Sequence, residues 1–313
     1  MIKKAILAAM MVCALLASAS CSARSSDYTP HENTGVALAA TQKTQAEIDT
    51  LFATRVHSPA LPPLEKPTEE ICTDYASSGL LRICYRAQTD AKIKLQVLKD
   101  GESIAYNLEA DGSVEDFSLQ YGSGEYTARI MQNIKDDQYF VVTSKTFEVV
   151  LISETDVYLN SIQNVNWNYG KKPIKDVRNI VTDSLTGLED AQLLSGCSDE
   201  LYQYVIENIA YDSNKVFDLM YDYIPDIEKT YIENSGICYD YASLFAAMLR
   251  SIGVPAKLVK GYSMQDPNTY HAWNEVYLDG KWVVIDTTLD ASLPLGSAPM
   301  EKNPQDYAKV YEY

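Results

Sequence analysis

The chain has 313 residues, of which 46% are hydrophobic and 22% are charged, and its formal net charge is −17. This length can hold one large domain or two modest ones, each with its own core, and the composition is ordinary for globular proteins. So acidic a surface would repel nucleic acids and anionic membranes, so we expect neither as a partner.

The first segment, residues 1–20, has the pattern of an export signal peptide. Two lysines precede a short apolar run, residues 5–16, and small residues then lead into Cys21. The run is too short to span a membrane. Cleavage before Cys21 would give a lipidated cysteine and a membrane-anchored lipoprotein, whereas cleavage after Ala19 would give a secreted protein. We favour lipidation at Cys21, and either route predicts an exported protein.

Residues 21–66 are rich in Ser, Thr, Ala, Pro and charged residues, and they end in a proline-rich stretch. This composition predicts a flexible tether with a short helix near residues 45–52. The tether would separate Cys21 from the folded part of the chain.

Residues 67–152 alternate apolar and polar side chains with a period of two, which is typical of strands with one buried face. Turn signals such as Asp100-Gly101 and Asp111-Gly112 separate these segments. We therefore predict an N-terminal antiparallel β-sandwich of the immunoglobulin type, in an α+β protein. The expected strands are residues 80–85, 91–98, 125–131 and 147–151.

One of the six cysteines lies in the predicted signal peptide and another is Cys21. In an oxidising compartment the remaining four invite pairing, and Cys72 and Cys84 flank a short turn that a local disulfide would close. A bond between Cys197 and Cys238 is an alternative that would oppose catalysis at Cys238. No Cys/His cluster has zinc spacing, so no metal is expected.

A helical connector is expected over residues 153–195, followed by a C-terminal domain, residues 196–313. A helix begins near Ser198 and ends before Tyr211, and a looser region follows it. A second helix begins at Cys238 and ends at Gly253, because apolar residues recur at helical spacing between them. Its stripe consists of Tyr241, Leu244, Phe245, Met248, Leu249 and Ile252.

Cys238 starts this second helix instead of lying inside its apolar stripe. The free N–H groups and the positive dipole end of a helix favour a thiolate over a thiol. The backbone N–H of Cys238 would also be a donor for an oxyanion. The alternative is a buried structural cysteine, which its position at the end of the stripe makes less attractive.

His271 is the one histidine of three that lies in the C-terminal part of the chain. Asp279-Gly280 predicts a two-residue hairpin in which Trp273 faces Asp286 and His271 faces Thr288. His271 and Asp286 are then diagonal neighbours on one face, with Cα atoms roughly 7–8 Å apart. Asp286 would orient the imidazole, which would take the proton of Cys238.

Together these motifs resemble the core of the transglutaminase-like superfamily over about residues 198–290. The matching segments are Gly236-Ile-Cys238-Tyr-Asp240-Tyr, Gly253-Val-Pro255, His271-Ala-Trp273-Asn-Glu275 and Asp286-Thr287. The resemblance implies a papain-like fold with Cys238, His271 and Asp286 as nucleophile, base and orienting carboxylate. It suggests Tyr211 as a second oxyanion donor, although a structural tyrosine is the simpler interpretation. Thr287 stands where many members have proline.

From this resemblance we expect a thiol enzyme that acts on amide bonds through a thioester, with no cofactor. Water as acceptor makes it a peptidase or amidase, and an amine makes it a transglutaminase, with hydrolysis somewhat favoured. The expected substrates are exported proteins or cell-wall peptides. The alternative is a non-catalytic or redox-gated binding protein that uses the same fold as a scaffold.

Overall fold

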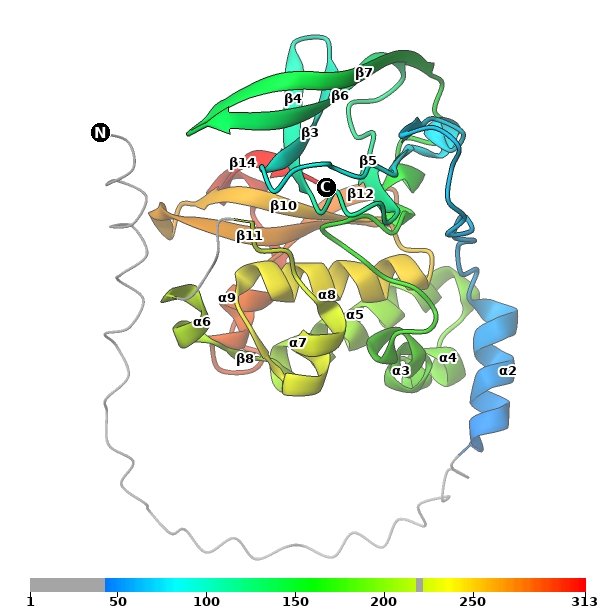
Figure 1. Ribbon diagram of the computed structural model, residues 1–313. Helices are drawn as coiled ribbons and strands as arrows, with labels where there is room; N and C mark the ends of the chain where they lie inside the picture. Colours follow the sequence, from blue (N-terminus) through cyan, green and yellow to red (C-terminus); the bar gives the residue numbers. More distant parts are fainter. Residues whose placement is uncertain (1–42, 218–221) are drawn as a thin grey trace, which may run out of the picture.

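The computed structural model describes residues 43–217 and 222–313 (Figure 1). Signal peptide and lipidation at Cys21 are predictions that lie outside the described residues. The short 3₁₀-helices η1 to η3 span Ala76–Ser78, Asp156–Leu159 and Pro304–Asp306. The α-helices are α2 (Gln45–Arg55), α3 (Lys172–Ile180), α4 (Thr182–Gly187), α5 (Asp190–Asn208), α6 (Ser213–Phe217), α7 (Ile227–Glu233), α8 (Cys238–Ser251) and α9 (Thr287–Ala291).

The strands come from two parts of the chain, and each part contributes one of the two largest sheets. The first part supplies β1 (Ile71–Cys72), β2 (Leu80–Ile83), β3 (Ile93–Lys99), β4 (Glu102–Leu108), β5 (Glu115–Ser118), β6 (Gly124–Lys135) and β7 (Gln138–Val149). The second supplies β8 (Ala210–Tyr211), β9 (Ser235–Gly236), β10 (Ala256–Ser263), β11 (Asp266–Leu278), β12 (Lys281–Ile285), β13 (Glu301–Lys302) and β14 (Tyr307–Glu312).

The predicted antiparallel sheets of the N-terminal part are confirmed. One sheet has the order β4-β3-β6-β7 and a smaller one the order β1-β2-β5, with every neighbouring pair antiparallel. Asp100 and Gly101 have φ angles of 49° and 89°, as the two-residue turn between β3 and β4 requires. Alternate side chains of β3 and β6 are buried, which explains the period of two in the sequence.

The predicted disulfide between Cys72 and Cys84 is not formed, and both are free cysteines. In the β1–β2 pair Cys72 faces Arg82, while the N–H of Cys84 donates to the carbonyl of Glu70. This register makes the two cysteines diagonal neighbours, whose Cα atoms are typically about 7–8 Å apart. Disulfides usually need about 4.4–6.8 Å, so the strand register opposes the bond.

The short helix expected near residues 45–52 is confirmed as α2, which packs on α3 and α4 instead of lying in a flexible tether. Helix α2 begins with a capping box, in which Thr44 and Glu47 each accept a backbone N–H of the other. At its other end Arg55 donates to the carbonyl of Leu188 at 2.6 Å and pairs with Asp190 at 2.8 Å. The Thr44/Glu47 capping box marks the start of this helix in the sequence, but the polar composition gave no sign that the helix would dock.

The C-terminal part combines a five-stranded antiparallel sheet, of order β13-β12-β11-β10-β14, with a layer of helices. Figure 1 shows α3, α5, α7 and α8 on one side of this sheet and the four-stranded sheet on the other. Helix α8 packs directly on β10 and β11, and α3 and α5 pack on α8. The segment expected as a connector therefore contributes to the helical layer around α8. The main cluster of buried hydrophobic side chains extends from Val56 to Tyr313.

Candidate active site

Cys238 is the first residue of α8, as the apolar stripe predicted. Every residue of the helix after Cys238 is buried, which explains why its apolar face is so broad. The helix ends at Ser251, and Gly253 follows its C-cap with a φ of 83°, which suits glycine. The carbonyl oxygen of His57 lies so close to Gly253 that there is no room for a Cβ. At the other end, Cys238 lies at the N-terminus of the helix, where the helix dipole is positive.

The β11–β12 hairpin has the predicted register up to its last pair. Leu278 faces Lys281, Glu275 faces Val284, and Asn274 faces Ile285. The expectation that His271 faces Thr288 is wrong, because β12 ends at Ile285 and the chain turns into α9. This turn places Asp286 at the N-cap of the short helix α9.

Asp286 is nevertheless beside His271, as predicted. The Nε2 atom of His271 donates to Oδ2 of Asp286 at 2.8 Å, and Oδ1 accepts the N–H of Leu289 at 3.0 Å. The carboxylate is 1% exposed and also accepts the hydroxyl of Tyr307 at 3.0 Å. Three donors from three elements therefore hold its orientation.

The side chain of Cys238 also acts on the imidazole of His271, so the thiol and the carboxylate both influence this ring. Since Nε2 is engaged by Asp286, Nδ1 is the nitrogen available to the sulfur. Burial acts to lower the pKa of His271, but the hydrogen bonds with Asp286 and Cys238 outweigh it and raise the pKa to about 10. The site thus favours an imidazolium over a neutral imidazole.

Asp240, on the first turn of α8, fixes the backbone that leads into Cys238. Its Oδ2 accepts the N–H of Ile237 at 2.9 Å and the ammonium of Lys215 at 2.7 Å, and its Oδ1 accepts the hydroxyl of Tyr223. A Cβ at Gly236 would lie 2.6 Å from the Cβ of Asp240, so only glycine fits there. This explains why the sequence before the cysteine is Gly-Ile.

Tyr211 lies next to this loop but at the surface. Strands β8 and β9 pair in parallel, with Tyr211 opposite Gly236, two residues before Cys238. The tyrosine is 46% exposed. The structure therefore brings Tyr211 to the cysteine loop, while its role as an oxyanion donor stays a prediction.

Tyr307 contacts the candidate site, although no sequence motif predicted it. Its hydroxyl bonds Asp286, and its ring packs on Trp273 with centroids 5.0 Å apart. Tyr307 begins the sheet's edge strand β14 and carries no motif, so the sequence offered no signal for it. Cys197, the alternative disulfide partner of Cys238, is buried in α5, and both cysteines are free.

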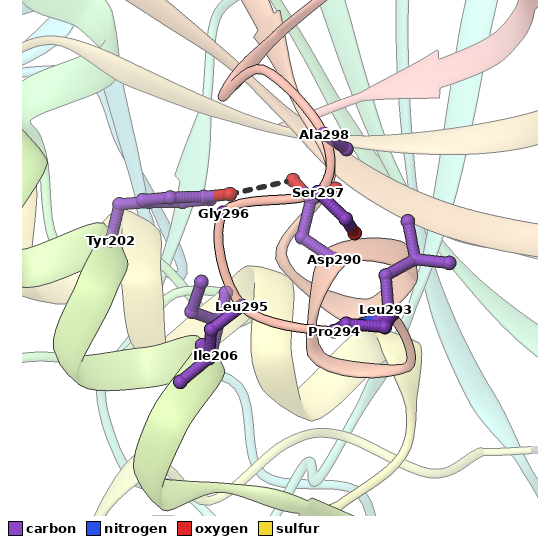
Figure 2. A pocket seen from close by; sticks show the side chains of 9 residues that line it. All are labelled: Tyr202, Ile206, Asp290, Leu293, Pro294, Leu295, Gly296, Ser297 and Ala298. Carbon is purple, nitrogen blue, oxygen red and sulfur yellow. Dashed lines mark hydrogen bonds between the residues drawn. The ribbon is translucent and has the colours of Figure 1, made fainter. Parts of the chain in front are cut away.

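A small cavity beside α9 does not serve as a substrate pocket. Figure 2 shows it between α5 and the loop after α9, where Tyr202 donates to Asp290 at 2.9 Å. Its volume is about 10 Å³, which corresponds to roughly one water molecule. Asp290 also pairs with Lys302 at 2.7 Å. These contacts anchor α9, the helix that Asp286 caps.

Two further findings concern the described residues, 43–217 and 222–313. They contain no helix that is long and apolar enough to cross a membrane. Nor do they bring three or more His, Cys, Asp or Glu side chains together in a way that would hold a metal ion.

Comparisons with known proteins agree with this geometry. The family model of the Transglutaminase-like superfamily matches residues 181–287. Kyphoscoliosis peptidase of Homo sapiens is 40% identical over 65 residues, which are 18% of this chain and 10% of that protein. The mouse protein of the same name matches equally, so the alignment spans about a tenth of these relatives.

Solved structures resemble the chain more distantly. A protein of Cytophaga hutchinsonii, proposed to be a cysteine protease, is 14% identical with a TM-score of 0.38, and the match covers 75% of this chain and 76% of that one. Red sea bream transglutaminase is 11% identical with a TM-score of 0.31, covering 67% and 48%. The family match contains the cysteine, the histidine and the aspartate that the structure brings together. Residues 181–287 of this chain are thus similar to the core of the Transglutaminase-like superfamily.

Proposed function

We propose that this protein is a thiol enzyme that attacks amide bonds through a thioester intermediate. The observation that carries the proposal is the interaction of His271 with both Cys238 and Asp286, with a 2.8 Å bond to the carboxylate. The alternative, a non-catalytic or redox-gated scaffold, gains no support from a structure in which Cys238 is free and paired with an imidazole.

The proposed first half-reaction forms the thioester. The sulfur of Cys238 attacks the amide carbonyl, and the Cys238 N–H at the start of α8 donates to the oxygen that becomes negative. His271, which has taken the thiol proton, gives it to the departing amine, so the C–N bond breaks and an S-acyl enzyme remains. Asp286 holds the ring in place throughout.

The second half-reaction decides between hydrolysis and transfer. His271 takes a proton from water or from an amine, which attacks the acyl carbon and releases Cys238. Transfer would need exclusion of water and a groove for the amine. We favour hydrolysis, and the relative with 40% identity over its aligned segment is named a peptidase. Exported proteins and cell-wall peptides are the proposed substrates.

The test offers a glutamine-containing peptide to the full chain, with and without a primary amine. Mass spectrometry would detect a gain of the amine for transfer, or glutamate and cleaved peptide for hydrolysis. Either product must disappear in Cys238→Ala and His271→Ala. Products that persist in Cys238→Ala contradict the proposal, and so does a Cys197–Cys238 linked peptide in the non-reduced protein.

Export is a separate part of the proposal and rests on residues 1–21 alone. We propose a lipoprotein anchored through Cys21 at the cell surface, or a secreted protein if cleavage follows Ala19. Cell fractionation of Cys21→Ser tests the anchor. The anchored form should move from the membrane fraction to the soluble one, and an unchanged distribution contradicts lipidation.

A further inference from the structure

Two lysines on strand β10 have similar aromatic surroundings but different charge partners. The ammonium of Lys257 lies 4.5 Å from the ring centroid of Trp282, and that of Lys260 lies 3.4 Å from that of Tyr239. Lys257 is also paired with Glu312 at 3.1 Å and with a second carboxylate at 3.5 Å. Across residues 43–217 and 222–313, no carboxylate lies within salt-bridge distance of Lys260.

Lys260 is close to the candidate nucleophile. The ring beneath its ammonium belongs to Tyr239, the residue that directly follows Cys238. Along β10, Lys260 faces Ala272 on β11, so its side chain leaves the sheet on the face opposite to that of His271. Asn274 leaves β11 on the same face as Ala272 and donates to the carbonyl of Ala242, so α8 packs on this face. Its charge interacts with the side chain of Cys238. The ammonium therefore lies beside the N-terminal end of α8, near the candidate nucleophile.

The second ring around this ammonium belongs to Tyr313, with its centroid 5.3 Å away. Aromatic faces attract a cation but do not neutralise it, and a cation taken out of water without an anion is costly. Consistent with this, burial lowers the pKa of Lys260 to about 8. At neutral pH the ammonium of Lys260 is still mainly charged. It has no carboxylate partner among the described residues, and a substrate could supply one.

We infer that Lys260 binds a carboxylate of the acyl substrate next to the carbonyl that Cys238 attacks. The inference rests on the proposed function, because it takes Cys238 as the attacking group. It makes Lys260 a specificity residue and assigns the enzyme to acidic peptides. The carboxylate would come from an Asp or Glu side chain or from a peptide C-terminus, since both present the same anion.

Two thiol reagents that differ in one group test the inference. The Cys238 sulfur displaces iodide from the methylene carbon of either iodoacetate or iodoacetamide and becomes alkylated, but only iodoacetate carries a carboxylate. The measured quantity is the ratio of their alkylation rates at Cys238, followed by mass spectrometry of the full chain. Any effect of Lys260 on the sulfur itself changes both rates and cancels in this ratio.

We expect Lys260→Met to lower the iodoacetate-to-iodoacetamide ratio about tenfold, the size of one charge-assisted contact. Lys260→Arg should keep most of the preference. Lys257→Met is the matched control, since it removes a lysine from the same strand and the same kind of aromatic site. Its ratio should stay at the wild-type value, because Lys257 already has carboxylate partners.

Failure of the inference is distinguishable from failure of the proposed function. If Cys238 reacts in a His271-dependent manner but Lys260→Met leaves the ratio unchanged, only the inference is overturned. An equal fall in Lys257→Met also overturns it, because general charge attraction would then suffice. If Cys238 reacts with neither reagent, the proposed function is overturned and the inference falls with it.

Protection by peptides identifies the source of the carboxylate. A capped tripeptide with a central glutamate and a trialanine with a free C-terminus are compared with their carboxamide counterparts. Slower iodoacetamide labelling with the first peptide supports a side-chain carboxylate, and slower labelling with the second supports a terminal one. Protection by neither at millimolar concentration counts against the inference.

Discussion

The two ends of α8 both carry buried charge, but the charges have different partners. At the N-terminal end, Asp240 orders the loop and Cys238 meets the His271–Asp286 pair. At the C-terminal end, the fully buried guanidinium of Arg250 donates to three backbone carbonyls, at 2.9, 2.6 and 2.9 Å. These carbonyls belong to Ala256, Asn160 and Tyr313.

The difference shows how one helix can serve chemistry and stability separately. Backbone carbonyls cannot change protonation state, so the Arg250 cluster is fixed and joins three segments of the chain. The groups at the other end can exchange protons, and the imidazole has partners on both sides. Substitutions at the N-terminal end should therefore change activity more than stability, and those at the C-terminal end should do the reverse.

Cys238→Ala should give the largest effect, a loss of activity of at least about a thousandfold, because no other group can form the thioester. The free energy of unfolding, measured by urea titration, should change by less than about 1 kcal/mol, since a small side chain at a helix start is replaced by another. Residual thioester formation in this variant would show that the nucleophile lies elsewhere.

Asp286→Asn should lower kcat roughly a hundredfold to a thousandfold, because an amide would favour the wrong imidazole tautomer and would not stabilise the imidazolium. KM should change little. The variant is nearly isosteric and keeps an oxygen to accept the N–H of Leu289, so α9 should stay folded by circular dichroism. Wild-type kcat in Asp286→Asn would remove this carboxylate from the proposed mechanism.

Arg250→Met should reverse the pattern and cost about 3 kcal/mol or more of stability, because three carbonyls lose their donor in a dry environment. Urea titration measures the loss, and kcat per folded molecule should match the wild type. Arg250→Lys, which can satisfy fewer carbonyls, should lie between the two. A large fall in kcat without a fall in stability would contradict the division between the two ends of α8.

The groups at the N-terminal end of α8 could be predicted from the sequence because their positions depend on local patterns. The apolar stripe of α8 placed Cys238 at the helix start, and the Asp279-Gly280 turn fixed the register up to Ile285. Both features depend on periodicity within about fifteen residues. The pairing of His271 with Asp286 followed from them, although the chain leaves the strand at Asp286.

The rest depends on contacts between segments that lie far apart in the chain. Tyr307 reaches Asp286 from an edge strand, and Arg250 finds its acceptors in three different segments of the chain. Neither contact has a spacing rule in the sequence. The same holds for α2, whose docking through Arg55 cannot be foreseen from a polar composition.

The unfolding free energy should fall with rising pH because of His271. Its pKa in the folded chain is raised to about 10 by Asp286 and Cys238, against the effect of burial. In the unfolded chain the value is about 6.5. A group with a raised folded pKa stabilises the protein fully below the unfolded value, and this stability is lost as pH rises through the folded one.

Between those two pKa values the slope from His271 should be about −1.4 kcal/mol per pH unit, the value for one proton. Urea titrations of wild type and His271→Ala at several pH values measure it as a difference. The comparison is needed because Lys260, with a lowered pKa, contributes with the opposite sign above pH 8. Parallel curves for the two proteins would mean that the imidazole is not held as a cation.

Tyr307→Phe should give the smallest effect. It tests whether Tyr307 supports the catalytic groups at the N-terminal end of α8. The ring keeps its contact with Trp273, so stability should change by less than about 1 kcal/mol. Loss of one of three donors should make Asp286 a slightly worse partner for the imidazolium and lower kcat about threefold to tenfold. Tyr277→Phe, on the same sheet but away from Asp286, is the control. A wild-type kcat in Tyr307→Phe would mean that only Cys238, His271 and Asp286 are needed for the reaction. A loss of kcat as large as that of Asp286→Asn would mean that the Tyr307 hydroxyl is as important as the carboxylate.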